Sequence, residues 1–228
     1  MPFTQGTDVY VVLKKTGARH LYHANSVTTS YTFLKQGGLL SRGFVEDHYL
    51  KQTPQSSDEI DKKHGIWHRI FLDSVDIHDR AGERNRYGPV LFQFDLNILL
   101  KLIAGTEILV TKKNPVHWDD GDPDSKRWFR SKDELGKGIK FGDFGQMLVI
   151  ETPSEKLDFP NSRMLIVLDD PLRKISSGEE CFTHAHNRLT AAAGPVEASI
   201  ERRKCRRTCG CAKEYAEDTN EKINLYFT

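Results

Sequence analysis

The sequence predicts an α+β domain built on a mostly antiparallel sheet with short helices. Two observations carry this prediction: short β-branched or apolar runs recur along the chain, and few stretches keep a helical period for long. The runs expected to form strands are 8–13, 19–24, 89–96, 107–113, 146–151 and 163–168. Many short strands with few long helices are typical of the α+β class.

The expected helices lie between these strands. Residues 26–40 have an apolar face and reach a stop at Gly37-Gly38, because glycine readily ends a helix. Shorter or mixed helical patterns are expected at 57–64, 66–85, 97–104 and 180–201. Residues 114–138 read as a loop, and 202–215 as a basic, cysteine-rich turn.

Length and composition limit the organisation of the chain. With 228 residues and a net charge of +1, it fits one domain with a small appendage. We expect a main domain at 1–178 and an extension at 179–228. The sequence has no apolar run of membrane-spanning length and no secretory signal at its start, which predicts a cytoplasmic protein without a membrane partner.

All four cysteines lie late in the chain, at Cys181, Cys205, Cys209 and Cys211. In a reducing compartment, clustered thiols are more often metal ligands than disulfides, so we expect a structural zinc site. His184 and His186 are alternatives to Cys181. The basic residues around the cysteines would suit phosphate contacts, or they form a solubilising end; they are Arg202, Arg203, Lys204, Arg206, Arg207 and Lys213.

A second constellation lies near the start. A predicted strand ends in Tyr22-His23, a helix follows, and then comes Gly-Leu-Leu-Ser-Arg at 38–42; a later segment, 76–94, carries arginines before Gly-Pro and a strand. This order of motifs resembles that of the DarT-type DNA ADP-ribosyltransferases over roughly residues 20–150. The resemblance implies an ADP-ribosyltransferase-like split sheet and NAD as substrate.

The resemblance also implies roles for particular residues. His23 would orient the ribose next to nicotinamide, and Tyr22 would stack on the nicotinamide ring. Asn25 stands where threonine is expected, and Leu40 and Ser41 belong to the turn. Arg80, Arg84 and Arg86 would bind phosphates, or else form a solvated basic face.

The acid that the family places at the start of a late strand is missing. Gln146 occupies that position, after the loop 114–145. Either another acid serves, with Glu151 the nearest, or position 146 carries an inactivating Glu→Gln substitution. In an extended strand Glu151 points away from the face of Gln146, which disfavours it. Position 146 is therefore the expected catalytic one.

The expected function is NAD-dependent ADP-ribosylation of a nucleic-acid base, with single-stranded DNA before RNA, as a toxin or phage-defence enzyme with an antitoxin partner. The alternative is a zinc-containing nucleic-acid-binding or interaction module without catalysis. A metal-dependent nuclease is a third class, with ligands drawn from Asp119, Asp120, Asp122 and Asp124 or from Asp169 and Asp170.

Overall fold

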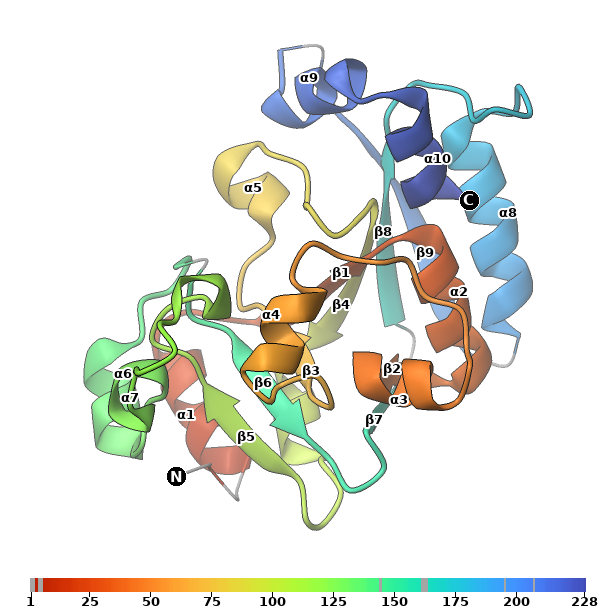
Figure 1. The fold of residues 1–228 in the computed structure, drawn as a ribbon. Coiled ribbons are helices and arrows are strands. Elements are labelled where there is room, and N and C mark those ends of the chain that lie inside the picture. Colours follow the sequence, from red (N-terminus) through yellow and green to blue (C-terminus); the bar gives the residue numbers. More distant parts are fainter. Residues whose placement is uncertain (1–2, 4–5, 144, 161–163, 195, 207) are drawn as a thin grey trace.

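A mixed four-stranded sheet organises the fold, in the order β1-β4-β8-β9 (Figure 1). Strand β1 (His20–Asn25) pairs antiparallel with β4 (Val90–Asp95), and β4 pairs antiparallel with β8 (Met164–Asp170). β9 (Ala198–Lys204) runs parallel to β8, so the chain must cross over between them. Helix α8 (Cys181–Ala193) makes that crossover and packs on the helix that follows β1. The computed structural model describes residues 3, 6–143, 145–160, 164–194, 196–206 and 208–228.

A second sheet is antiparallel throughout and meets the first at β1. Its order is β3 (Ile70–Leu72), β6 (Leu148–Glu151) and β5 (Glu107–Val110). The backbones of Tyr22 and Asp73 exchange two hydrogen bonds, of 2.8 and 2.9 Å, which join the sheets. A separate antiparallel pair joins β2 (Gly38–Leu40) to β7 (Lys156–Asp158). The α+β class is therefore confirmed, with β8 and β9 as a parallel pair.

The stretch predicted as the first strand is a helix, α1 (Gly6–Lys15). Val9, Val12 and Leu13 are buried, and their spacing of three and four residues forms one face of a helix. A short β-branched run can form either element, and here burial of this face against the second sheet and the segment after β4 decides the outcome.

Helix α2 (Val27–Gln36) begins and ends where its caps allow. The side chain of Ser26 accepts a hydrogen bond from the backbone of Thr29, and Gly37 takes a left-handed conformation with φ of 70°. The predicted helix therefore stops before residue 40, and β2 follows it directly.

The other predicted elements are mostly present, with two differences: the expected loop at 114–138 contains short helices, and the expected helix at 180–201 is shorter. The expected strands at 89–96, 107–113, 146–151 and 163–168 correspond to β4, β5, β6 and β8, although residue 163 lies outside the described part. The expected helix at 180–201 ends at Ala193, and its last four residues, 198–201, belong to β9. The remaining helices are α3 (Arg42–Asp47), α4 (Asp58–Lys63), α5 (Ile77–Ala81), α6 (Asp124–Arg127), α7 (Lys132–Gly138), α9 (Gly210–Glu217), α10 (Asn220–Phe227) and the 3₁₀ turns η1 (Leu96–Leu100) and η2 (Pro115–His117).

The main hydrophobic core draws on both ends of the chain. Buried side chains from α1, α2, β1, β4 and β8 pack in one cluster with Cys211, Tyr215, Ile223 and Phe227 of the C-terminal helices. The segment beyond residue 179 thus shares both a sheet and a core with the rest of the chain. None of the described helices has the length and apolar character needed to cross a membrane.

Gly88 sets the approach between β1 and the start of β4. Its φ is 143°, and a Cβ there would lie 2.5 Å from the backbone C and O of Asn25 and the N of Ser26. We expect Gly88→Ala to lower the free energy of unfolding by about 3 kcal/mol, since backbone at both sides cannot yield cheaply. Urea denaturation measures this. Gly121→Ala is the control, because nothing lies within 4 Å of its Cβ position; an equal loss in both variants would contradict the prediction.

Candidate functional site

A narrow cavity lies where β1, β2, β3 and the 114–116 turn meet. It holds about 70 Å³, which is room for about five water molecules. Three of the residues singled out from the sequence line it: His23, Asn25 and Leu40. A wider cavity of about 910 Å³ lies by η1 and β7, and none of the residues singled out from the sequence lines it. The narrow cavity is therefore the one that the sequence pattern marks.

His23 is held in one orientation and one protonation state. Its Nδ1 lies 2.8 Å from the carbonyl oxygen of Phe71. A carbonyl only accepts, so Nδ1 carries the proton and Nε2 keeps a lone pair. The amide of Asn25 lies 3.4 Å from that Nε2. Burial, reinforced by the charge of Arg42, lowers the pKa of His23 to about 4, so the ring is neutral at pH 7.

Asn25 links three segments at the cavity. Its Oδ1 accepts hydrogen bonds from the backbone of Ser26 at 3.0 Å and from the side chain of Gln55 at 3.1 Å. The residue is 3% exposed. Its amide thus fixes the end of β1, the start of α2 and the loop before α4 relative to one another.

Arg42 is a cavity residue to which the sequence assigned no separate role. Its Nε lies 2.7 Å from one carboxylate oxygen of Asp58, and its Nη2 donates to the other at 2.8 Å and to the carbonyl of Thr53 at 3.0 Å. Its Nη1 is buried and has no hydrogen-bond partner among the described residues. The guanidinium therefore keeps one donor group for a ligand.

Two carboxyl groups in the cavity titrate far from their usual range. Burial raises the pKa of Asp73 to about 7. Burial also raises the pKa of Asp61 to about 7, partly opposed by a hydrogen bond with Ser57. Tyr87, on the same cavity, has its pKa raised by burial as well. Carboxyls near half-protonation at pH 7 suit proton transfer, and neither aspartate was marked by a motif.

Tyr22 and Ser41 do not line the cavity. Burial, followed by the carboxylates of Asp76 and Asp79, raises the pKa of Tyr22, which places its hydroxyl on the side of those acids. The hydroxyl of Ser41 donates to Glu155 at 2.6 Å and accepts from the backbone of Phe44 at 2.9 Å. It serves as the N-cap of α3.

Neither residue considered for the acid position lines the cavity. Gln146 is 6% exposed; its Oε1 accepts from the backbone of Lys140 at 2.7 Å, and its Nε2 donates to the carbonyl of Gly138 at 3.1 Å. Met147 faces the cavity in its place. Glu151 forms an ion pair of 2.8 Å with Arg69, which itself lines the cavity.

These contacts predict the outcome of Gln146→Glu. The change removes the donor to Gly138 and turns a second oxygen toward that carbonyl, so we expect a loss of about 1 kcal/mol in the free energy of unfolding. We expect no gain of NAD-dependent transfer, since the side chain points to the end of α7. Gln36→Glu, at an exposed helix end, is the control for stability. A gain of transfer would return position 146 to the site.

The three arginines before β4 also lie outside the cavity lining. Arg80 is exposed, with its guanidinium beside Gly142. Arg84 is 8% exposed and pairs with Asp218 at 2.7 Å. Arg86 is exposed. Arg84 is thus committed to the C-terminal helices.

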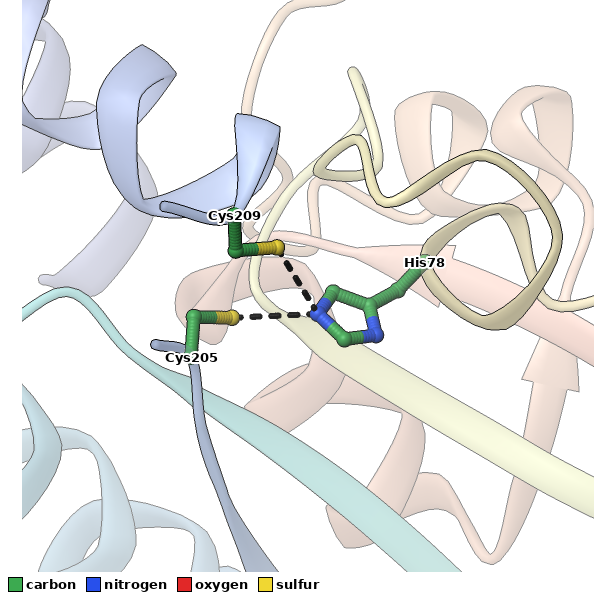
Figure 2. A group of neighbouring side chains, drawn as sticks. All are labelled: His78, Cys205 and Cys209. Atoms are coloured by element: carbon green, nitrogen blue, oxygen red, sulfur yellow. Dashed lines mark hydrogen bonds between the residues drawn. The ribbon is translucent and has the colours of Figure 1, made fainter. Parts of the chain in front are cut away.

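A His/Cys/Cys group joins α5 to the stretch between β9 and α9 (Figure 2). Nε2 of His78 lies 3.0 Å from Sγ of Cys205 and 3.6 Å from Sγ of Cys209, and all three ligand atoms lie within 4.8 Å of one another. Two ligands of a tetrahedral zinc ion are about 3.5 Å apart for ordinary zinc–nitrogen and zinc–sulfur bonds. The group can therefore bind a metal ion. His78 is separated from both cysteines by most of the chain, so no local spacing marks it.

The other two cysteines occupy different places. Cys211 is fully buried near the start of α9, and its thiol interacts with that of Cys205. Cys181 is fully buried in the main core at the start of α8 and is not in the group of Figure 2. Burial raises the pKa of Cys205 to about 11, so this thiol stays neutral until a cation is present.

Some of the basic residues near these cysteines form ion pairs, and others are exposed. Arg202 pairs with Asp170, and Arg203 with Asp76 and Asp169. Lys204, Arg206 and Lys213 are exposed, and Arg207 lies outside the described residues. The paired arginines serve the fold, which leaves a smaller basic surface than the sequence indicates.

Four of the aspartates considered for a nuclease are engaged by cations or hydrogen-bond donors: Asp120, Asp122, Asp169 and Asp170. Asp122 pairs with Lys113 at 3.0 Å and with Lys126 at 3.2 Å, and the hydrogen bond from Lys113 lowers its pKa. Asp169 accepts a hydrogen bond from the hydroxyl of Tyr215 at 2.8 Å. Within the described part of the chain, these acids do not form a group of three potential metal ligands.

Comparisons with known proteins add no family to this picture. No protein-family model matches the chain. No curated protein matches it either.

Proposed function

We propose that the narrow cavity binds NAD and that the protein transfers ADP-ribose to a nucleic-acid base, as a toxin or defence enzyme. One observation carries the proposal. The neutral His23, whose Nε2 faces the amide of Asn25, shares the cavity with Asn25 and with Leu40 of the Gly-Leu-Leu turn. These residues come from the two motifs of the resemblance, which are separated in sequence by α2. The proposal includes an ADP-ribosyltransferase-like arrangement of the sheets.

The cavity suits the nicotinamide end of the cofactor. Its volume of about 70 Å³ is smaller than a whole ring needs, so the nicotinamide would enter only in part and the adenosine half of NAD would lie along the opening. A ribose hydroxyl would replace the amide of Asn25 as the donor to Nε2 of His23, and Nη1 of Arg42 would donate to the ligand. Arg42 takes over, in this proposal, the role that the sequence pattern assigned to Arg84.

The reaction is a substitution at the anomeric carbon of the ribose. The bond from C1′ to the nicotinamide nitrogen breaks, and the electron pair leaves with nicotinamide. A base nitrogen of the acceptor bonds to C1′ and loses its proton to a carboxylate. The transition state resembles an oxocarbenium ion, which nearby negative charge stabilises. We assign the carboxylate role to Asp73, with Asp61 as the second acid of the cavity.

Labelled NAD tests the proposal directly. The protein is incubated with NAD labelled in its adenylate and with single-stranded DNA, RNA or total protein. We expect label on nucleic acid, on DNA before RNA. His23→Ala is expected to lower transfer about tenfold or more through the lost hydrogen bond. His20→Ala, on the same strand but outside the cavity lining, is the matched control. Label on protein in place of nucleic acid would contradict the proposed acceptor. Absence of both NAD binding and label would contradict the proposed transferase function.

A second function belongs to a different class. The exposed Lys204, Arg206 and Lys213 lie near the His/Cys/Cys group, and no acid stands at position 146. A nucleic-acid-binding module without catalysis would bind phosphates through these basic side chains and would need no acid at position 146. Binding that weakens as salt rises, without any transfer of label, would favour this function.

We propose zinc as the metal of the His/Cys/Cys group, in a structural role. Imidazole and thiolate are the donors that zinc prefers, and neither of the two cavities described above is lined by these residues. A structural ion needs a closed set of ligands and no position for substrate.

A further inference from the structure

One segment of the chain connects the cavity to the metal group. The connection between β3 and β4 begins with Asp73 and ends near Tyr87, and both residues line the cavity. Between them, on α5, His78 lies in the metal group. We call residues 73–87 the connecting segment. A contact that holds the middle of this segment therefore limits how far the chain between the two cavity residues can move.

The middle of the connecting segment is held by the C-terminal part of the chain. The carbonyl of Gly82 accepts hydrogen bonds from the backbone of Cys211 at 2.7 Å and from Sγ of Cys209 at 3.2 Å. The backbone of Arg84 donates to Glu214 at 2.9 Å. In Figure 1, α5 accordingly lies close to α9, although the two are far apart in sequence. These hydrogen bonds lie next to the His/Cys/Cys group.

Cys211 is the candidate for a fourth ligand. Its thiol interacts with that of Cys205 but lies outside the group of three ligand atoms, so it would have to change its side-chain rotamer to join them. The Nε2 of His78 faces the sulfur atoms, while its Nδ1 has no hydrogen-bond partner among the described residues and lies 3.5 Å from the carboxylate of Asp79, which a small movement would make its acceptor. A carboxylate behind a histidine ligand is a common support in metal sites. Three thiolates and one imidazole are a usual structural zinc set.

We infer that one zinc ion, held by His78, Cys205, Cys209 and Cys211, clamps the connecting segment to the C-terminal helices and thereby sets one wall of the cavity. The inference rests on the proposed zinc ion and not on the proposed transferase activity. Zinc binding and order of the cavity wall are then linked, because an ion that binds one arrangement of the segment stabilises that arrangement.

Metal analysis of the purified protein tests the ligand set without any substitution. We expect one zinc ion per chain, and X-ray absorption of the zinc form should show three sulfur ligands at about 2.3 Å and one nitrogen at about 2.0 Å. Two sulfur ligands with oxygen in the remaining position would overturn the assignment of Cys211. A protein that neither retains nor takes up zinc would overturn the whole inference.

The two buried cysteines provide a matched pair of variants. Both Cys181 and Cys211 are fully buried in the main core, so their replacement by serine disturbs packing in similar ways. We expect Cys211→Ser to weaken zinc binding at least tenfold and Cys181→Ser to leave it unchanged, as measured by competition with a chromophoric chelator. The opposite ranking would place Cys181 in the site and overturn the proposal.

Hydrogen exchange tests the link to the cavity. Chelation of zinc from the full chain should speed amide exchange across the connecting segment at least tenfold, and re-addition of zinc should restore protection. Helix α7 is the internal reference, since it lies outside the contacts described above. Unchanged exchange in the connecting segment, with zinc demonstrably removed, would overturn the clamp. Because no NAD enters these measurements, their failure is distinct from failure of the transferase proposal.

Discussion

Asp73→Asn is expected to stabilise the protein above pH 7 and, at the same time, to lower NAD-dependent transfer about 100-fold or more. Asp73 lies in the cavity, and burial raises its pKa to about 7 from a usual value of 3.8. The folded state therefore holds the proton more tightly than the unfolded chain. Its contribution to stability is full below pH 3.8 and is lost as the pH rises to about 7.

An asparagine at position 73 does not pay this ionisation cost. The shift of about three pKa units corresponds to about 4 kcal/mol, which water in the cavity would reduce to about 2 kcal/mol. The difference in unfolding free energy between Asp73→Asn and the wild type should thus be near zero at pH 4 and about 2 kcal/mol at pH 8.5. Urea denaturation at both pH values measures it.

Asp61→Asn is the informative comparison for the same experiment. Its pKa is also raised to about 7 by burial, so a pH-dependent gain in stability is expected there too. Its hydrogen bond with Ser57 engages the carboxyl, and we expect a smaller loss of transfer than at Asp73. If Asp73→Asn were less stable than the wild type at every pH, the carboxylate would have a structural role, and the catalytic assignment would fail.

The sequence predicted the elements whose pattern is local. β4, β5, β6 and β8 carry runs of β-branched and aromatic residues, and Gly37 ends α2 where its left-handed conformation is needed. Residues 8–13 were mistaken for a strand because six residues of β-branched character fit either period. β9 was missed for the opposite reason: its sequence ASIERRK has no buried apolar alternation, and it is held as an edge strand by pairing with β8.

The candidate site divides in the same way. His23, Asn25 and Leu40 lie in short motifs, so the sequence could mark them. Asp61 and Asp73 lie in stretches without a motif, and burial alone changes their chemistry. His78 joins Cys205 and Cys209 only through the fold. Ligands contributed from distant segments cannot be derived from spacing within one of them.

Arg84→Ala is expected to lower the free energy of unfolding by about 3–5 kcal/mol, the usual cost of removing one partner of a buried ion pair. Nη1 of Arg84 lies 2.7 Å from Asp218, and their side chains are 9% and 8% exposed. Removal of the guanidinium leaves a buried carboxylate with Lys222 at 3.2 Å as its nearest cation. Arg86→Ala, at an exposed arginine two positions on, should change stability by less than about 0.5 kcal/mol.

The same variant separates the two roles that Arg84 could have. If Arg84 joined the ligand, NAD binding would fall in Arg84→Ala even at a temperature where the variant is fully folded. The ion pair with Asp218 instead predicts unchanged NAD binding under those conditions. It also predicts that Asp218→Asn added to Arg84→Ala recovers part of the lost stability, because the buried charge that Arg84 had neutralised is removed. Calorimetry of ligand binding and a double-mutant cycle in urea measure the two outcomes. Arg84 would then count as the anchor that holds the end of the connecting segment on α9 and α10, and the binding of phosphate would rest on Arg42.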